Sequence, residues 1–200
     1  MVGAILLGIL FLATVWITGS LLSSSVNQPI GEPPSDVVAN AVQFPSLSGA
    51  TIHGWFIQGK ENSGAIILMH GVRANRLSML ERARFLSGTG YSVLLFDFQA
   101  HGESNGGNIT FGYLGSKDTQ AAISFVRSRL PKEKIGIIGV SMGGAAVLLA
   151  KPQLEVNAVV LEMVYPTIEQ AVSNRITTRL GDWATILTPL LTWQLKPSAL

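Results

Sequence analysis

The 200-residue sequence predicts an α/β fold in three layers, with a mostly parallel sheet between two layers of helices. Short runs that are apolar throughout alternate with segments of helical periodicity, which is typical of repeated strand–helix units. Runs without polar alternation indicate strands buried on both faces, as in a parallel sheet. The apolar fraction of 48% is enough for a large core and excludes a generally disordered chain.

The expected elements follow one another along the chain. Two extended runs, Val37–Phe44 and Thr51–Gln58, flank the turn-forming residues PSLSG and predict a hairpin-like pair. Four further apolar runs predict buried strands: Gly64–His70, Tyr91–Asp97, Lys134–Val140 and Val156–Met163. Segments between and after them predict helices: Arg76–Ser87, Asp118–Leu130, Met142–Ala150 and Pro166–Leu180. Pro166 suits a first helical turn, where a missing N–H costs nothing.

The N-terminal segment has the composition of a membrane signal. No charged side chain precedes Glu32, and Val2–Leu22 would span about 30 Å as a helix. Residues 1–23 are therefore predicted to form a transmembrane helix that contacts the membrane through Val2–Leu22. A signal peptide cleaved among Gly19–Ser25 and a buried core helix are the alternatives. The expected location is a single-pass membrane protein with its folded domain on the non-cytoplasmic side, since only the α-amino group biases the orientation.

Composition bounds the remaining organisation and the function classes. Residues 24–36 are rich in Ser and Pro and predict a linker, and residues 37–200 predict the folded domain. Lys and Arg total 14 against 12 Asp and Glu, without a basic cluster, so a nucleic-acid partner is not expected. The sequence has no Cys, which excludes disulfides, a thiolate nucleophile and a Cys-based zinc site.

The sequence Gly139-Val140-Ser141-Met142-Gly143-Gly144 fits the pattern G-x-S-x-G between a predicted strand and a predicted helix. A serine on such a sharp turn needs small residues two positions to either side, because Cβ atoms there would collide. The following helix N-terminus adds free N–H groups and partial positive charge. The alternative is that Gly139, Gly143 and Gly144 only permit close helix–sheet packing, with Ser141 as the helix N-cap.

Three motifs in order make the chain resemble the α/β-hydrolase family: His70-Gly71 after a strand, the loop DFQAHGES at residues 97–104, and the turn at Ser141. The resemblance implies an α/β-hydrolase fold with about six of its eight strands present. It also implies that Ser141 is the nucleophile, that the amides of Val72 and Met142 form the oxyanion hole, and that no cofactor is needed. Gln99 stands where the family usually has Arg, which we expect to weaken loop anchoring more than chemistry.

The catalytic base is the missing part of this resemblance. The family places its acid and then its His after the nucleophile, and no His follows Ser141. His70 and His101 stand at structural motif positions, and His53 lies in an early strand. Glu162 is the candidate acid, but without a base it would orient nothing. No histidine spacing typical of a metal site occurs, and no metal is expected. We therefore expect the hydrolase domain to be incomplete at its C-terminus.

Two function classes follow from these observations. The first is a membrane-anchored serine hydrolase that cleaves an ester, thioester or peptide bond of a small-molecule or peptide substrate. The second is a non-catalytic binding protein or inactive fragment with the same fold. We expect Val156–Met163 to be an exposed apolar edge strand that favours association and poor solubility. Residues Trp183–Trp193 carry no charge and predict either part of a cap over the site or ordinary helix packing.

Overall fold

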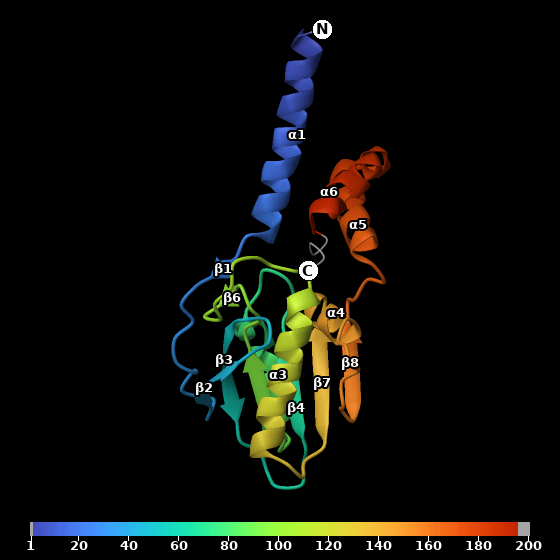
Figure 1. The fold of residues 1–200 in the computed structure, drawn as a ribbon. Helices are drawn as coiled ribbons and strands as arrows, with labels where there is room; N and C mark the ends of the chain where they lie inside the picture. The colour runs from blue at the N-terminus through green and yellow to red at the C-terminus, as the bar shows by residue number, and fades with distance from the viewer. Residues whose placement is uncertain (1, 196–200) are drawn as a thin grey trace. The chain divides into compact units, whose positions relative to one another are not determined.

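A computed structural model describes residues 2–195, and these divide into two compact units. Residues Ser25–Val164 form the larger unit, which holds the sheet (Figure 1). The other described residues form the smaller, helical unit, which contains α1 (Val2–Ser23), α5 (Ile168–Leu180), η2 (Asp182–Leu187) and α6 (Thr188–Leu195). The helix predicted to start at Pro166 begins at Ile168, and the Thr167 side chain caps it by accepting from the Gln170 amide at 3.1 Å.

The N-terminal prediction needs correction. α1 is helical, but a membrane span requires about 20 predominantly apolar residues in one helix. Within residues 2–195, no helix meets the combined requirement of length and apolar character. The predicted transmembrane helix is therefore wrong on this finding. The contact with the membrane through Val2–Leu22 and the single-pass location, which both depended on that helix, are withdrawn with it.

The larger unit is built on a sheet whose strands lie in the order β2-β3-β5-β4-β7-β8. The bounds are β2 Asn40–Pro45, β3 Thr51–Ile57, β4 Ala65–Met69, β5 Ser92–Phe96, β7 Ile135–Val140 and β8 Ala158–Glu162. β2 and β3 form the predicted hairpin-like pair, and β3 also runs antiparallel to β5. The pairs β4–β5, β4–β7 and β7–β8 are parallel, so the sheet is mixed.

Helices cover the sheet on both faces, which confirms the three predicted layers. The helices are η1 Arg76–Met79, α2 Leu80–Gly88, α3 Tyr113–Arg129 and α4 Met142–Leu148. Ala122 and Val126 of α3 and Ala146 of α4 belong to one buried cluster, together with Ile67 and Phe96 of the sheet. On the opposite face, η1 and α2 pack in a second cluster with other residues of the same strands; its members include Met79, Leu80, Ala83, Leu68 and Leu95. Side chains alternate along each strand, so consecutive residues fill different cores.

The predicted linker, residues 24–36, contains a short strand that forms part of the larger unit. β1 (Val26–Asn27) lies parallel to β6 (His101–Gly102). The Val26 amide donates to the Ala100 carbonyl at 2.9 Å, and the Gln28 amide donates to the Gly102 carbonyl at 2.8 Å. Beyond this pairing, the amides of Ile30 and Gly31 both donate to the Glu103 carboxylate. We call residues 26–31 the strap, because they hold the loop that follows β5.

Candidate active site

The residues that carry the three motifs lie at the carboxyl ends of neighbouring parallel strands (Figure 1). His70 and Gly71 follow β4, and Asp97 follows β5. Ser141 follows β7, whose residue Gly139 pairs with Met69 of β4. In a sheet of this kind, the carboxyl ends of the strands are where ligands bind. The fold therefore brings the two loops and the turn at Ser141 to one edge of the sheet.

Ser141 has a strained backbone at the junction of β7 and α4. Its φ of 50° and ψ of −111° lie outside the regions that a side chain of L configuration normally adopts. The conformation is held from both sides: the Ser141 amide donates to the Glu162 carbonyl at 2.8 Å, and the Ser141 carbonyl accepts from the Ala145 amide at 2.9 Å. Strain of this kind persists where surrounding structure enforces it, as at functional sites.

The glycines around Ser141 are required by close backbone contacts. A Cβ added to Gly139 would lie 2.8 Å from the backbone carbon of Gly143. One added to Gly143 would lie 2.7 Å from the Met69 carbonyl oxygen, and one added to Gly144 would meet the Val164 side chain at 2.2 Å. These separations are shorter than real Cβ contacts, so the small residues let α4 approach β4 and β7. The geometry agrees with the reason for which the sequence analysis selected these positions.

The loop after β4 lies beside Ser141. A Cβ on Gly71 would be 3.6 Å from the Ser141 Cβ, so this glycine is next to the candidate nucleophile. Val72 follows directly, and Met142 is the first residue of α4. Within residues 2–195, neither the Val72 amide nor the Met142 amide donates a hydrogen bond to another protein group. Both amides are thus available to an acceptor on a bound molecule.

His70 and His101 use their ring nitrogens to bind the backbone. His70 accepts from the Phe98 amide through Nε2 at 3.1 Å, and its Nδ1–H donates to the Gly71 carbonyl at 2.7 Å. His101 accepts from the Arg73 amide through Nε2 at 3.1 Å, and its Nδ1–H donates to the Gln99 carbonyl at 2.9 Å. A backbone N–H needs an unprotonated ring nitrogen, which assigns both tautomers. These roles agree with the structural positions that the motifs implied.

Burial keeps both rings neutral. Burial, assisted by the neighbouring His101, lowers the pKa of His70 to about 3. Burial also lowers the pKa of His101 below its usual value, against the hydrogen bond to Gln99, which acts in the opposite direction. Neither histidine is therefore free to accept the Ser141 proton, because both nitrogens of each already have backbone partners.

The other predicted site residues lie apart from this arrangement or have different partners. His53 is in β3, which β5 and β4 separate from β7 in the sheet. Glu162, at the end of β8, forms an ion pair with Arg82 of α2, whose Nη2 lies 2.5 Å from its Oε2. The structure thus provides a guanidinium partner for the candidate acid and no histidine partner. Within the described range, no group of three His, Asp or Glu side chains could hold a metal ion.

A buried ionic network that the sequence motifs did not reveal lies under the two loops. Arg76 is only 1% exposed, and its guanidinium bonds Asp97 at 2.5 Å and also binds Glu103. The Arg76 amide donates to the other oxygen of Asp97 at 2.7 Å. Burial acts to raise the pKa of Glu103, but the hydrogen bonds from Arg76, Gly31 and Ile30 outweigh it and lower this pKa to about 2. The sequence offered one signal for this network, the two carboxylates Asp97 and Glu103 within DFQAHGES. Their partner Arg76 lies 21 residues before Asp97, so no local motif joins it to them.

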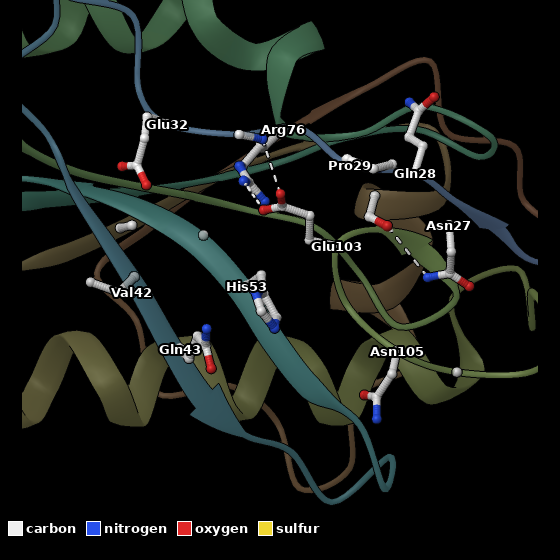
Figure 2. Close-up of a pocket in the computed structure, with 15 residues that line it drawn as sticks. Asn27, Gln28, Pro29, Glu32, Val42, Gln43, His53, Arg76, Glu103 and Asn105 are labelled. Carbon is white, nitrogen blue, oxygen red and sulfur yellow. Dashed lines mark hydrogen bonds and ion pairs between the residues drawn. The ribbon is translucent and has the colours of Figure 1, made fainter.

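A cavity of about 880 Å³ lies on another side of the larger unit, between the strap and the β2–β3 pair. Figure 2 shows His53 and Gln43 on the hairpin strands, with the joined side chains of Arg76 and Glu103 on the facing wall. Gln28, Pro29 and Glu32 line it from the strap and the residue after it. None of the residues around Ser141 lines this cavity, so it is separate from the candidate active site.

The fold and the site belong to the α/β-hydrolase type, with a strained serine between a strand and a helix. Comparison with known families matches residues 60–196 to the serine aminopeptidase S33 family. Because the match spans more than half of the chain, the protein belongs to this family. The family assignment confirms the resemblance that the sequence motifs indicated and supports a hydrolase.

Individual proteins are similar to this chain in sequence or in fold. The chain is 31% identical to the protein YqkD of Bacillus subtilis (strain 168) over 54% of the chain and 36% of YqkD. It is 30% identical to thiohydrolase aneE of Aspergillus aculeatus over 54% of the chain and 35% of that protein. An esterase structure from Pyrococcus furiosus superposes with a TM-score of 0.67 at 23% identity, covering 88% of this chain and 70% of the esterase. The chain thus spans about a third of the length of these two curated relatives.

Proposed function

We propose that the full-length protein is a serine hydrolase in which the Ser141 hydroxyl attacks the carbonyl carbon of an ester, thioester or peptide bond. The observation that carries this proposal is the strained backbone of Ser141, with a φ of 50° at the start of α4, beside Gly71. A serine on such a turn is held outward from the sheet edge, where a substrate can reach it. Attack forms the bond from Oγ to the carbonyl carbon while the hydroxyl proton passes to a base, and that proton leaves with the departing amine, alcohol or thiol when the bond to the leaving group breaks. Water then hydrolyses the acyl-enzyme, releasing the acid and restoring the Ser141 hydroxyl.

The oxyanion formed in this step would lie against the amides of Val72 and Met142. Both amides lack acceptors within the described part of the chain, and both belong to segments that contact the Ser141 turn. Preorganised backbone N–H groups stabilise a tetrahedral oxyanion, and losing one such donor typically costs about 2.7–4 kcal/mol in the transition state. Since the donors are backbone groups, no particular side chain is required at either position.

The substrate class rests on chemistry shared with relatives. The family is described as a serine aminopeptidase family, one relative is named a thiohydrolase and one solved neighbour is an esterase. Each name denotes attack on an acyl carbon, so we propose a small-molecule or peptide acyl substrate. Ser141 also needs a base, and both ring nitrogens of His70 and of His101 have backbone partners while His53 lies three strands from β7. The mechanism therefore requires a proton acceptor other than these three histidines.

Hydrolysis of short-chain p-nitrophenyl esters and acyl thioesters by the full-length protein tests the proposal. We expect Ser141→Ala to reduce kcat at least about 1,000-fold, because it removes the attacking atom. Ser124→Ala is the matched control: Ser124 lies on α3, where its hydroxyl donates to the Gln120 carbonyl, and activity should not change. A folded wild-type protein without any such activity would instead favour the non-catalytic binding role, and an active Ser141→Ala variant would exclude Ser141 as nucleophile.

A further inference from the structure

We propose that His101 is a positioning residue that fixes the oxyanion amide of Val72 through its hydrogen bond to the neighbouring Arg73 amide. The inference rests on the proposed function, because it assigns a role within the same site. His101 contacts neither Ser141 nor a substrate in this proposal. It acts only through the backbone of the loop that follows β4.

The geometry around Arg73 shows why one hydrogen bond matters there. Arg73 has a φ of 58°, a left-handed conformation that a residue with a Cβ adopts at a cost. Its amide donates to His101 Nε2 at 3.1 Å, and this bond fixes the peptide that joins Val72 to Arg73. The Val72 amide, one peptide earlier, makes no protein hydrogen bond within the described residues. The Val72 N–H belongs to the Gly71–Val72 peptide, whose carbonyl accepts from His70 Nδ1–H at 2.7 Å and from the Ala74 amide at 3.3 Å. His101 holds the next peptide, and both peptides together set the direction of the Val72 N–H.

The ring of His101 is itself held on all sides. Its side chain is 1% exposed, and Nδ1–H donates to the Gln99 carbonyl. The His70 ring lies beside it, with 5.1 Å between ring centroids, and His70 in turn binds the Gly71 carbonyl. The two histidines thus hold the two peptides that flank the Val72 Cα. His70 donates to the Gly71 carbonyl, and His101 accepts from the Arg73 amide.

The loop that carries His101 is anchored by the strap and the ionic network. β6 contains His101 and pairs with β1 of the strap, and the Asn27 side chain donates to the Ser104 carbonyl at 2.6 Å. Glu103 accepts from the Ile30 and Gly31 amides at 3.0 Å each and binds Arg76 through its other oxygen. Figure 2 shows this pairing of Arg76 with Glu103. The loop that carries His101 is therefore connected, through the Arg76–Glu103 ion pair, to the segment after β4 that contains the Arg73 amide.

A rigid amide contributes mainly in the transition state, because the oxyanion forms only then. Loss of the His101 acceptor should therefore lower kcat and leave KM nearly unchanged. A general loss of folded protein would also lower the apparent kcat at unchanged KM, so kcat is expressed per folded active site, counted by titration with a covalent serine probe. The kcat per folded site, together with its rescue by a conservative variant, separates positioning from a merely structural role.

The test compares three variants of the full-length protein in ester hydrolysis. His101→Leu removes the acceptor, and we expect kcat to fall about 10- to 100-fold with KM within about threefold of wild type. His101→Gln can place a carbonyl oxygen near the Nε2 position. Its log kcat should therefore lie at least about halfway from the His101→Leu value back to the wild-type value. His53→Leu is the control and should leave kcat unchanged, because the His53 ring makes no hydrogen bond within the described residues and the substitution keeps the backbone bonds to Ser104 and Asp97.

Hydrogen exchange gives a second readout that needs no activity. In a peptide covering residues 71–75, the Arg73 amide should exchange faster in His101→Leu than in wild type, with protection partly restored in His101→Gln. Unchanged exchange together with unchanged kcat in His101→Leu would overturn the positioning role. Equal defects in His101→Leu and His101→Gln would also overturn it, because the acceptor would then be irrelevant. Failure of the proposed function would give a different result, namely a Ser141→Ala variant that keeps its hydrolase activity.

Discussion

β7 has two neighbours in the sheet, β4 and β8, whose sequences are similarly apolar but whose surroundings differ. The β4 residues Ile67, Leu68 and Met69 have no exposed surface. On the other flank, Val159 is 43%, Val160 49% and Leu161 38% exposed. Both neighbours are parallel to β7 and bond to it in register. β4 is paired with β5 on its other side, whereas β8 ends the described sheet, so the exposure of β8 reflects its edge position as well as what covers its faces.

The two flanks of β7 support the Ser141 turn through different contacts. From the β4 flank come the backbone oxygens that require glycine at position 143, and the loops that carry His70 and Arg76. From the β8 flank the turn receives the Glu162 carbonyl, which accepts from the Ser141 amide, and the Val164 side chain against Gly144. We expect substitutions on the buried flank to cost stability and those on the exposed flank to change association. The following predictions test this division, from the largest effect on stability to the smallest.

Arg76→Met should give the largest loss. The substitution leaves Asp97 buried without its cation, and breaking a buried pair in this way typically costs about 3–5 kcal/mol. Chemical denaturation of the full-length protein measures the loss. Arg84→Met is the matched control, because Arg84 pairs with Asp36 and Glu81 at the surface, where water screens the pairs, and its loss should be much smaller. Equal losses in the two variants would contradict the importance of the buried network.

Gly143→Ala should destabilise the buried flank by about 1–3 kcal/mol, since the new methyl group would meet the carbonyl oxygens of Met69 and His70. Thermal unfolding of the variant gives the shift. Gly107→Ala provides the control, because a Cβ there meets nothing within 4 Å and should change stability by less than about 0.5 kcal/mol. If Gly143→Ala unfolds at the wild-type temperature, the close approach of α4 to β4 does not constrain the turn.

Val160→Lys should hardly change the free energy of unfolding, within about 0.5 kcal/mol, because this side chain is already half exposed. A charge on an edge strand opposes pairing with another chain, so self-association should decrease. Sedimentation velocity over a concentration series measures it. Val38→Lys, on a 91% exposed side chain away from β8, controls for the added charge. Equal association in both variants and the wild type would show that β8 is not an associating edge.

The sequence predicted those features that local patterns determine. The serine turn, its three glycines and the order of strands and helices follow from short motifs and periodicity, and the structure contains them. The edge position of β8 was also predicted and is confirmed within the described sheet. The catalytic roles of Ser141, Val72, Met142 and Glu162 stay predictions.

Features that depend on distant contacts were missed or wrong. Arg76 looked like an ordinary helix residue, and only the fold brings Asp97 and Glu103 to it from 21 and 27 residues away. The strap looked like a flexible linker, because its pairing partner, β6, is a two-residue strand in a glycine-rich loop. The Gln99 side chain donates to the Asn108 carbonyl at 2.8 Å, which the sequence did not indicate, and its backbone amide donates to Asp118; weaker anchoring than with Arg stays a prediction. The transmembrane assignment of α1 rested on the length of an uncharged apolar run and did not hold.

The most direct test of the account is to locate the adduct that a fluorophosphonate probe forms on the full-length protein. Such probes react with activated serines, because the phosphorus centre mimics the acyl carbon and its tetrahedral state. Peptide mapping by mass spectrometry should find the adduct on Ser141, and Ser141→Ala should not be labelled while Ser124→Ala labels like the wild type. An adduct on another residue, or labelling that survives Ser141→Ala, would contradict the assignment of Ser141 as the nucleophile.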